Sequence, residues 1–260
     1  LQRFQRVPDG KRYHGSPAVE TSSDYCPIAP MACSTRRRAI YGALQFAGIV
    51  AIAVPVSMLV LNYWYDVFAY FTGITSAHFH ELTPAFVAVM LIASAGVTVG
   101  GLLLGLGLIY AVPRLCNLFL TPGRTYVMYG VHYWLQNVVW ILSNSRFYNL
   151  LFGDSSFIIH YMRFVGWTLN KVEQTGSNFG TNQRHDNPFL CEIGSGTMVS
   201  DGLSMINTHM SASSFQLAPA RIGESNYLGN DIHYPPDGRT GANCLLGTKV
   251  IDEDGTDESR

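Results

Sequence analysis

Residues 39–65 read AIYGALQFAGIVAIAVPVSMLVLNYWY and contain no Asp, Glu, Lys or Arg. As an α-helix this stretch would extend for roughly 40 Å, which is enough to cross a hydrocarbon core of about 30 Å. Pro55 lies near its middle and predicts a kink, which neighbouring helices can tolerate. The aromatic residues Tyr63, Trp64 and Tyr65 at its end are typical of a membrane interface. The stretch therefore predicts a first transmembrane helix.

A second charge-free stretch, residues 82–113, predicts another crossing because Leu, Ile, Val and Phe dominate it. Arginines flank the two stretches on the outside of the pair: Arg36, Arg37, Arg38, Arg114 and Arg124. The connection between them, residues 66–81, contains no Lys or Arg. The positive-inside rule then predicts that both termini are cytoplasmic and that the short loop is external. We expect a multi-pass protein of a bacterial cytoplasmic membrane, with the lipid bilayer as a partner.

Glycines recur along one side of the second stretch, in two overlapping small-xxx-small patterns: Gly96, Gly100, Gly101 and Gly105. Such patterns let helix backbones approach closely. They predict packing against the other helix of the hairpin or against a second subunit in a homo-oligomer. The alternative is that glycine is simply common in membrane helices.

Residues 125–145, TYVMYGVHYWLQNVVWILSNS, lack formal charge but mix polar and aromatic side chains. Apolar residues recur at helical spacing, with His132, Gln136 and Asn137 on the other side. This pattern predicts an amphipathic helix lying in the membrane interface, and a third membrane span is the alternative. An interfacial helix would tether the following residues to the inner membrane face.

The overall composition narrows the class of protein. Only 13% of the residues are charged, against about 25% in typical soluble proteins, and the net charge is −1. A near-neutral chain gives no indication of nucleic acid as a partner. The cysteines are scattered and form no CxxC pair, which indicates reduced thiols rather than a disulfide framework or a zinc site. They stand at Cys26, Cys33, Cys116, Cys191 and Cys244.

From residue 192 onward the sequence has a six-residue repeat, in which a residue that is mostly aliphatic is followed by glycine. The pairs are Ile193-Gly194, Ile222-Gly223, Leu228-Gly229, Thr240-Gly241 and Leu246-Gly247. Val199 and Met205 continue the register, and Thr197 and Cys244 supply a small residue three positions after a glycine. This is the pattern of hexapeptide β-helices, in which the aliphatic side chain points inward and glycine allows the corner conformation.

The rhythm is interrupted at residues 208–220, which we expect to loop out, and residues 251–260 read as an acidic tail or linker. The predicted fold class is membrane α plus β: a two-helix transmembrane hairpin and an interfacial helix, followed by a left-handed parallel β-helix. The chain begins at Leu1 and stops in the acidic run, so we expect it to be an excerpt from a longer protein. The predicted divisions are a tail of a preceding β-helix-like domain (1–35), the hairpin (36–113), the interfacial helix and linker (114–165), and a truncated β-helix (166–260).

Three stretches together carry a resemblance to a known family. They are FQRVPDGKRYHGSPAVET at residues 4–21, IGSGTMVSDGLSMIN at 193–207 and ARIGESNYLGNDIHYPPDGRTGANCLLGTKV at 220–250. With the hairpin, they resemble the membrane-embedded carboxyl-terminal region of poly-ε-lysine-synthetase-like non-ribosomal peptide synthetases. In that family tandem hexapeptide-acyltransferase-like domains lie between membrane helices. HGSPA at residues 14–18 looks like the closing corner of a preceding domain of this kind.

The resemblance implies a domain that joins an amine to an acyl group delivered as a phosphopantetheine thioester on a carrier domain. The implied partners are that carrier domain and the tandem β-helix domains of the same polypeptide, and no cofactor is implied in this segment. Such a reaction needs a general base near neutral pKa and donors for the oxyanion, and histidine is the natural base.

The candidate catalytic residues are His209, His233, Asn207 and Asp237. His209 follows Asn207 in the expected excursion, and His233 to Gly238 matches the second half of the HHxxxDG motif of condensation domains, with Ile232 in place of the first His. Each histidine, like His185 before the clear repeats, is alternatively a surface or corner residue.

Four other interpretations remain to be considered at this stage. The repeat region could be a non-catalytic, membrane-tethered scaffold or channel for an active tandem copy. A metal site of the γ-carbonic-anhydrase kind would use His185, His209 and His233, but their spacing of 24 does not match an 18-residue coil. His78 and His80 could form a metal cluster in the external loop, although a solvated loop is the plainer interpretation. Neither metal reading is favoured, so no metal is expected. An export path is also disfavoured, because two helices cannot enclose a path and neither contains an internal charge.

Overall fold

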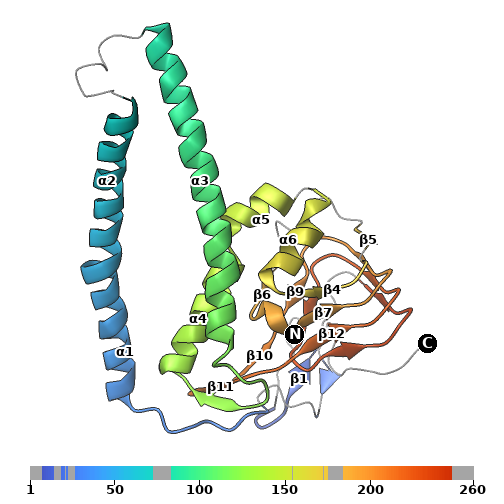
Figure 1. Ribbon diagram of the computed structural model, residues 1–260. Coiled ribbons are helices and arrows are strands. Elements are labelled where there is room, and N and C mark those ends of the chain that lie inside the picture. The colour runs from blue at the N-terminus through green and yellow to red at the C-terminus, as the bar shows by residue number, and fades with distance from the viewer. Residues whose placement is uncertain are drawn as a thin grey trace.

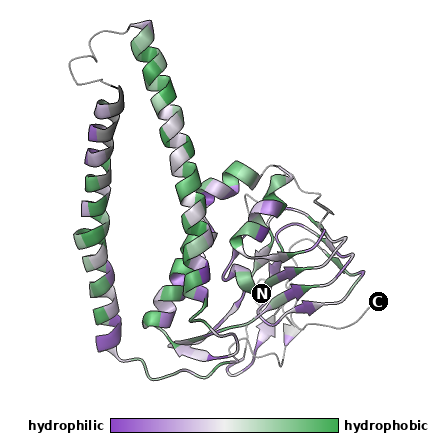
Figure 2. Ribbon diagram, viewed as in Figure 1, coloured by the Kyte–Doolittle hydropathy of each residue, from purple (hydrophilic) through white to green (hydrophobic). Residues whose placement is uncertain are grey.

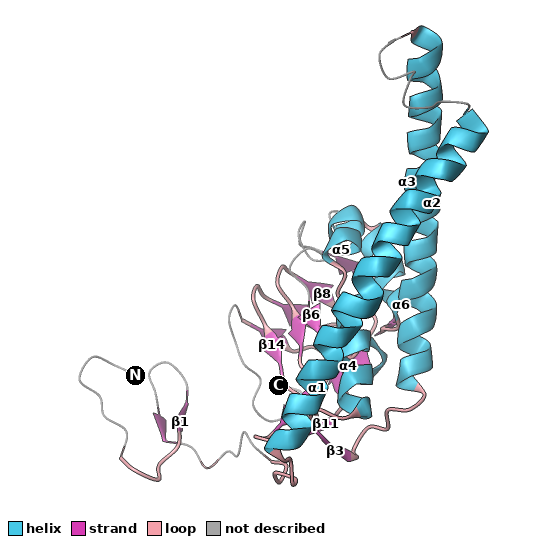
Figure 3. Ribbon diagram, turned by 90° about the vertical axis from the view of Figure 1, so that its left-hand side faces the viewer, coloured by secondary structure: helices cyan, strands magenta, loops and turns pink. Residues whose placement is uncertain are grey.

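The structure is a computed structural model that describes residues 8–14, 19–20, 22, 27–72, 83–153, 155–171, 173–174 and 184–247. Two long helical arms extend away from a body of short helices and strands (Figure 1). A view turned by 90° places the same body beside the lower half of the arms (Figure 3). The protein is thus mixed α and β, with helical arms and a strand-rich body.

The first arm consists of α1 (Thr35–Gly48), the π-helix η1 (Ile49–Ala53) and α2 (Val54–Thr72). The π-helical stretch ends just before Pro55, which has no N–H to donate to the preceding turn. Local widening of the helix accommodates such a missing bond. The expected distortion at Pro55 therefore takes the form of a π-helical segment.

The second arm is α3 (Pro84–Asn117), which begins at the Thr83 cap and continues past Pro113. Two helices, Thr35–Tyr63 and Pro84–Asn117, are long and apolar enough to cross a membrane. Hydrophobic residues colour much of both arms (Figure 2). The two predicted long apolar helices are therefore present and could be membrane spans, although the second helix does not end at Pro113.

Three helices follow the second arm: α4 (Val131–Ser143), α5 (Arg146–Gly153) and α6 (Phe157–Val165). At 13 residues α4 extends for roughly 20 Å, too short to cross a bilayer. The third-span alternative is therefore wrong. Gln136 of α4 faces inward and is 6% exposed, whereas Trp134 is 49% exposed. Gln136 and the fully buried Val139 thus face the strand-rich body, whereas Asn137 donates to the Tyr41 hydroxyl of α1 at 3.4 Å.

The lower half of α3 packs directly on this body. The Tyr148 hydroxyl of α5 donates to the Leu102 carbonyl at 2.9 Å, and a Cβ on Gly105 would collide with the Tyr148 ring. Arg114 donates to the Phe164 carbonyl of α6 at 2.9 Å. The absence of a side chain at Gly105 therefore allows Tyr148 of α5 to pack directly against α3. Among the described side chains, nothing lies within 4 Å of a Cβ built on Gly96, Gly100 or Gly101, so the predicted packing of these glycines against the other helix of the hairpin is not observed there.

The strands form three parallel sheets, which the chain visits in a fixed cyclic order. The sheets are β15-β12-β7-β4, β16-β13-β8-β5 and β14-β9-β6. Their bounds are β4 Thr168–Leu169, β5 Glu173–Gln174, β6 Arg184–His185, β7 Cys191–Ile193, β8 Met198–Val199, β9 Ser204–Met205, β12 Ala220–Ile222, β13 Tyr227–Leu228, β14 His233–Tyr234, β15 Arg239–Thr240 and β16 Leu245–Leu246. Each of the first three passes of the chain adds one strand to every sheet, and the last described pass adds β15 and β16 to two of them.

The strand register follows the six-residue spacing of the sequence. Ile222 pairs with both Ile193 and Thr240, and Leu228 pairs with Val199. The side chains of Ile193, Ile222, Leu228 and Val199 are at most 2% exposed. Complete burial of one such side chain stabilises the fold by about 1.5–3 kcal/mol. The residues expected to point inward thus form the core of the body.

The glycines at one corner are required by close backbone approach. A Cβ on Gly194 would lie 2.6 Å from the backbone of Gly223, and one on Gly223 would lie 2.5 Å from the Gly241 carbonyl. Neither Gly194 nor Gly223 is among the glycines with positive φ. The explanation that glycine provides a special corner conformation is therefore wrong for these two positions. The adjacent coil simply leaves no space for a side chain.

The predicted excursion is an antiparallel hairpin, β10 (Thr208–Met210) and β11 (Ser214–Leu217), with β3 (Thr125–Val127) as its third strand. It inserts into the step from Ile193 to Ile222, which is 29 residues long, whereas the next step, to Thr240, is 18. The interruption is confirmed, and it is an ordered hairpin.

Near the amino terminus, β1 (Tyr13–His14) pairs antiparallel with β2 (Val19–Glu20). A coil of the expected preceding β-helix domain would pair in parallel, so these strands do not form such a coil. Residues 15–18, which complete the HGSPA stretch, lie outside the described residues, as do the external His78 and His80 and the acidic tail.

Candidate functional site

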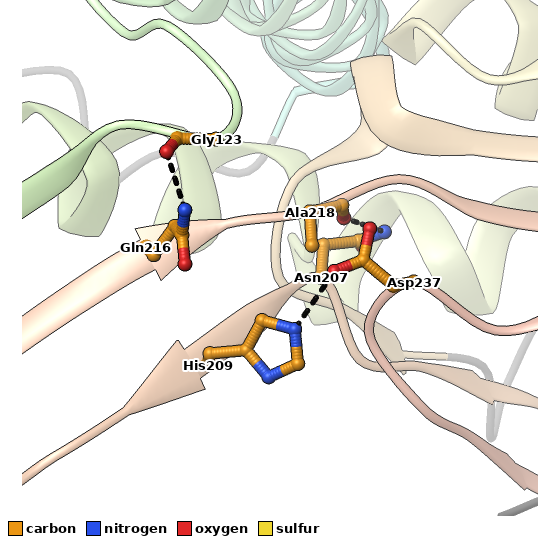
Figure 4. A network of polar contacts seen from close by, with 6 residues as sticks. All are labelled: Gly123, Asn207, His209, Gln216, Ala218 and Asp237. Atoms are coloured by element: carbon orange, nitrogen blue, oxygen red, sulfur yellow. Dashed lines mark hydrogen bonds and ion pairs between the residues drawn. The ribbon is translucent and has the colours of Figure 1, made fainter. Parts of the chain in front are cut away.

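Two of the four predicted catalytic residues meet. His209 lies in the middle of β10 and its Nε2 is 3.0 Å from the Oδ2 of Asp237. The His209 side chain is 17% exposed and the Asp237 side chain is 62% exposed. The two side chains point toward one another from separate parts of the chain (Figure 4). We refer to His209 and Asp237 as the dyad.

A tight turn presents Asp237 to the histidine. The Gly238 N–H donates to the Pro235 carbonyl at 3.1 Å, and Asp237 has a φ of 60°. Proline in the second position and a positive φ in the third are the pattern of a type II turn, and Asp tolerates the left-handed region. The sequence PPDG thus places a carboxylate at a fixed point beside the hairpin.

The hairpin holds His209 from the other side. His209 lies opposite Gln216 of β11, and the Gln216 amide donates to the Gly123 carbonyl in the segment after α3. Figure 4 shows this contact beside the dyad. β11 also pairs with β3, so the histidine is fixed to the segment that joins α3 to α4.

Asn207, the third predicted residue, has no exposed surface. Its Nδ2 donates to the carbonyls of Leu190 at 3.2 Å and Ala218 at 3.5 Å. Its Oδ1 accepts from the Asn187 N–H at 3.3 Å and the Cys191 thiol at 3.2 Å. These bonds occupy the side-chain amide with structural contacts, so Asn207 positions β10 and does not face the dyad.

His233, the fourth predicted residue, is in a different place. It lies on the outer side of β14, in register with Ser204 of β9, which in turn pairs with Arg184 of β6. Adjacent strands are about 4.8 Å apart, so these three side chains form a row. The row lines a groove of about 610 Å³. His209 follows Ile206, one of the residues that line this groove, by three positions. Asp237 contacts His209 and not His233. The match to the condensation motif is therefore not reproduced as a His233–Asp237 pair.

The groove combines positive, negative and aromatic groups. Its lining consists of Trp140, Arg184, His185, Asp186, Gly202, Ser204, Met205, Ile206, Asp231 and His233. Burial raises the pKa of the Asp186 carboxyl, whose Oδ2 accepts from the Asn207 N–H at 3.1 Å. Arg184 and His233 can bind an anionic group, and Trp140 offers an apolar surface. The groove thus places groups that can bind an anion beside one aromatic surface.

His185 faces the interior rather than the groove's open side. Its side chain is completely buried, which lowers its pKa to about 3. The Trp167 indole donates to its Nδ1 at 3.2 Å, so the neutral ring carries its proton on Nε2. A histidine held neutral in the core is not a suitable proton acceptor near neutral pH.

The three histidines of the metal hypothesis do not converge. His185 is buried in one sheet, His233 lies on the outer side of that sheet, and His209 belongs to the hairpin. Within the described residues there is no group of three His, Cys, Asp or Glu side chains that could hold a metal ion. Cys33, Cys116, Cys191 and Cys244 are thiols, and Cys26 lies outside the described residues.

The sequence reasoning missed Arg184, Asp186 and Trp140. The first two precede the regular repeats, in a coil where Leu169 pairs with Ile193 after 24 residues and His185 pairs with Met205 after 20. Because these steps differ from 18, register alone could not place them. Trp140 belongs to a helix that was expected to face only the membrane. No family model and no curated protein matches the chain.

Proposed function

We propose that this chain is a membrane-bound domain that transfers an acyl or aminoacyl group from a carrier-bound thioester to an amine and so forms an amide. In this proposal the three parallel sheets form a left-handed hexapeptide β-helix of the acyltransferase kind. The 18-residue step from Ile222 to Thr240, the stacked corner glycines and the buried aliphatic positions support it. The observation that carries the functional part is the 3.0 Å contact of the dyad.

The dyad supplies the chemistry that such a transfer needs. With the Nε2 proton donated to the Asp237 carboxylate, the Nδ1 lone pair of His209 is available as a base. The amine nitrogen attacks the thioester carbonyl, and His209 accepts the proton that the nitrogen loses. The thiol then leaves with that proton as the C–S bond breaks. Asp237 orients the ring and stabilises its charged form, as carboxylates do in other His-dependent catalysts.

The groove beside the dyad would hold the donor. Arg184 and His233 would bind an anionic group, such as the phosphate of a phosphopantetheine arm, and Trp140 would contact its apolar part. Because Ile206 joins the groove to β10, a bound arm could extend toward His209. The carrier domain itself is implied only by the family resemblance.

The membrane arms would keep this site at the cytoplasmic face. From Arg38 to Asp66 the helix extends for about 42 Å, close to the total thickness of a bilayer with its headgroups. The exposed apolar side chains of the short helices would lie in the same interface: Val131, Trp134, Ile141, Phe147, Leu150, Leu151 and Phe157. Both termini would then be cytoplasmic.

The test is amide formation by the full-length protein in membranes, with a panel of aminoacyl N-acetylcysteamine thioesters as donors and thiol release as the readout. We expect His209→Ala to slow the reaction by about 10²–10⁴-fold, the usual contribution of a general base. Asp237→Asn should also slow it, whereas the matched variant His160→Ala, an exposed histidine of α6, should not.

Raising the pH should partly restore the His209→Ala variant, because more of the amine is then already deprotonated. A wild-type rate in His209→Ala would eliminate the proposed base. Full activity of both His209→Ala and His233→Ala would favour the scaffold function, in which this domain only holds a tandem active copy.

A further inference from the structure

The helix pair α1 and α4 encloses a second cavity, far from the dyad in the sequence and built from different elements. Its volume is about 540 Å³. The lining residues are Ser34, Arg36, Arg37, Ile40, Tyr41, Leu44, Gln45, Tyr129, Gly130, Val131 and Trp134. The chemistry of this lining is divided: two arginines occur at one end, and apolar and aromatic side chains form most of the remainder.

Aromatic packing and hydrogen bonds hold the cavity walls in place. The Tyr41 ring lies 5.7 Å from the rings of both Tyr129 and Tyr133. Its hydroxyl accepts from Gln45 Nε2 at 3.0 Å and from Asn137 Nδ2 at 3.4 Å. The start of α1 is therefore braced against the start of α4, and the space between them is preformed.

Among the residues that the structure describes, no acidic side chain pairs with the arginines of the cavity. Arg36 and Arg37 are exposed, and within the described part of the chain no carboxylate lies at ion-pairing distance from either guanidinium. Arg38, by contrast, stacks on Tyr129 at 5.5 Å. Two exposed guanidinium groups beside a hollow are suited to bind an anionic group of a ligand.

The order of residues along the cavity indicates the class of ligand that fits it. From Arg36 to Leu44 the helix rises by about 12 Å toward the centre of the first membrane helix. Ile40 and Leu44 on this path are 48% and 67% exposed, and Trp134 faces them from α4 with 49% exposure. A ligand that fills the cavity thus has an anionic head at the arginines and a hydrocarbon part toward the bilayer.

We propose that this cavity is a binding site for an anionic glycerophospholipid, with its phosphate on Arg36 and Arg37 and its acyl chains along Ile40, Leu44 and Trp134. Basic pockets beside transmembrane helices on the cytoplasmic side bind acidic lipid headgroups in this manner. The lipid would fill the wedge between the membrane arm and α4, and so fix the strand-rich body against the membrane. This inference does not depend on the dyad or on the proposed transfer reaction.

The test uses the full-length protein in a neutral detergent, with thermal stability measured against three soluble probes. The probes are dihexanoyl-phosphatidylglycerol, dihexanoyl-phosphatidylcholine and sodium phosphate. A ligand that binds only the folded protein raises the melting temperature by an amount that grows with the logarithm of its concentration divided by its Kd. We expect the phosphatidylglycerol to bind at least tenfold more tightly than either the phosphatidylcholine, which lacks net charge, or phosphate, which lacks chains.

Variants locate the site. Arg36→Gln/Arg37→Gln should abolish the preference for phosphatidylglycerol, while Arg146→Gln/Arg239→Gln removes two positive charges elsewhere and should retain it. If the first variant does not insert, Trp134→Ala, a change at a half-exposed wall, should still weaken the lipid several-fold. Equal binding of the two lipids, equal binding of phosphate alone, or an unchanged preference in Arg36→Gln/Arg37→Gln would overturn the proposal.

Discussion

Replacement of Asn207 by alanine should destabilise the body of the protein by roughly 3 kcal/mol. The side chain is completely buried and its amide makes four hydrogen bonds, with partners that include the Asn187 N–H and the Leu190 carbonyl. Alanine removes all four and leaves at least these two backbone groups buried without a partner. Each such group costs about 1–3 kcal/mol. For a protein of this size that corresponds to a fall of ~6–12 °C in the melting temperature.

The assay is thermal unfolding of the purified full-length protein, followed by far-ultraviolet circular dichroism. Asn230→Ala is the matched control, because Asn230 is exposed and its Oδ1 accepts a single bond, from the Asp201 N–H at 3.2 Å. We expect this control to shift the melting temperature by less than about 2 °C. If Asn207→Ala unfolds at the same temperature as Asn230→Ala, the assignment of Asn207 to a structural role is wrong.

Three further substitutions test the packing at two glycines and the effect of the buried His185 on stability at low pH. Gly223→Ala should cost about 1–3 kcal/mol of stability, because its Cβ would lie 2.5 Å from the backbone of the next coil. Gly241→Ala should be near neutral, because no described atom lies within 4 Å of its Cβ. Chemical denaturation measures the unfolding free energies of both variants. The folded-state pKa of His185 is about 3, below its unfolded value of 6.5, so the unfolded state binds more protons as the pH falls and stability is lost from pH 6.5 downward. This loss should reach about 2–3 kcal/mol at pH 4.5, and His185→Leu should flatten the pH profile of the melting temperature over this interval. Gly105→Leu should separate α5 from α3 and expose new protease sites in α5, while Gly107→Leu, in open space, should not change the digestion pattern.

The parts of the fold that could be predicted are those in which one physical requirement determines the sequence. A bilayer demands about 20 apolar residues, so both membrane helices are visible in the composition. The inward positions of the regular coils must be apolar and six residues apart, so Ile222, Leu228 and their neighbours were placed correctly. The first coil has irregular steps, and no spacing rule could locate Arg184 or His185.

The candidate site could be predicted in part for a related reason. The excursion was visible as a loss of rhythm, and its histidine was recognised as a residue type suited to proton transfer. The Asp237 partner was singled out for a different reason, its place in a motif with His233. Only the three-dimensional path of the hairpin brings Asp237 to His209. Contacts between distant segments of the chain leave no local pattern in the sequence. The sequence therefore could not show that the Asn207 amide is occupied by structural hydrogen bonds, and Asn207 was predicted to be catalytic.

A chain of polar contacts joins α3 to the dyad. Asn117 at the end of α3 accepts from Asn187, whose backbone N–H donates to Asn207, the residue just before β10. On the other side of the hairpin, Gln216 bonds to Gly123 in the segment that follows α3. Both edges of the hairpin that carries His209 are thus tied to the carboxyl-terminal end of α3. The position of the proposed base therefore depends on how α3 docks on the strand-rich body, so detachment of α3 would displace His209 from Asp237.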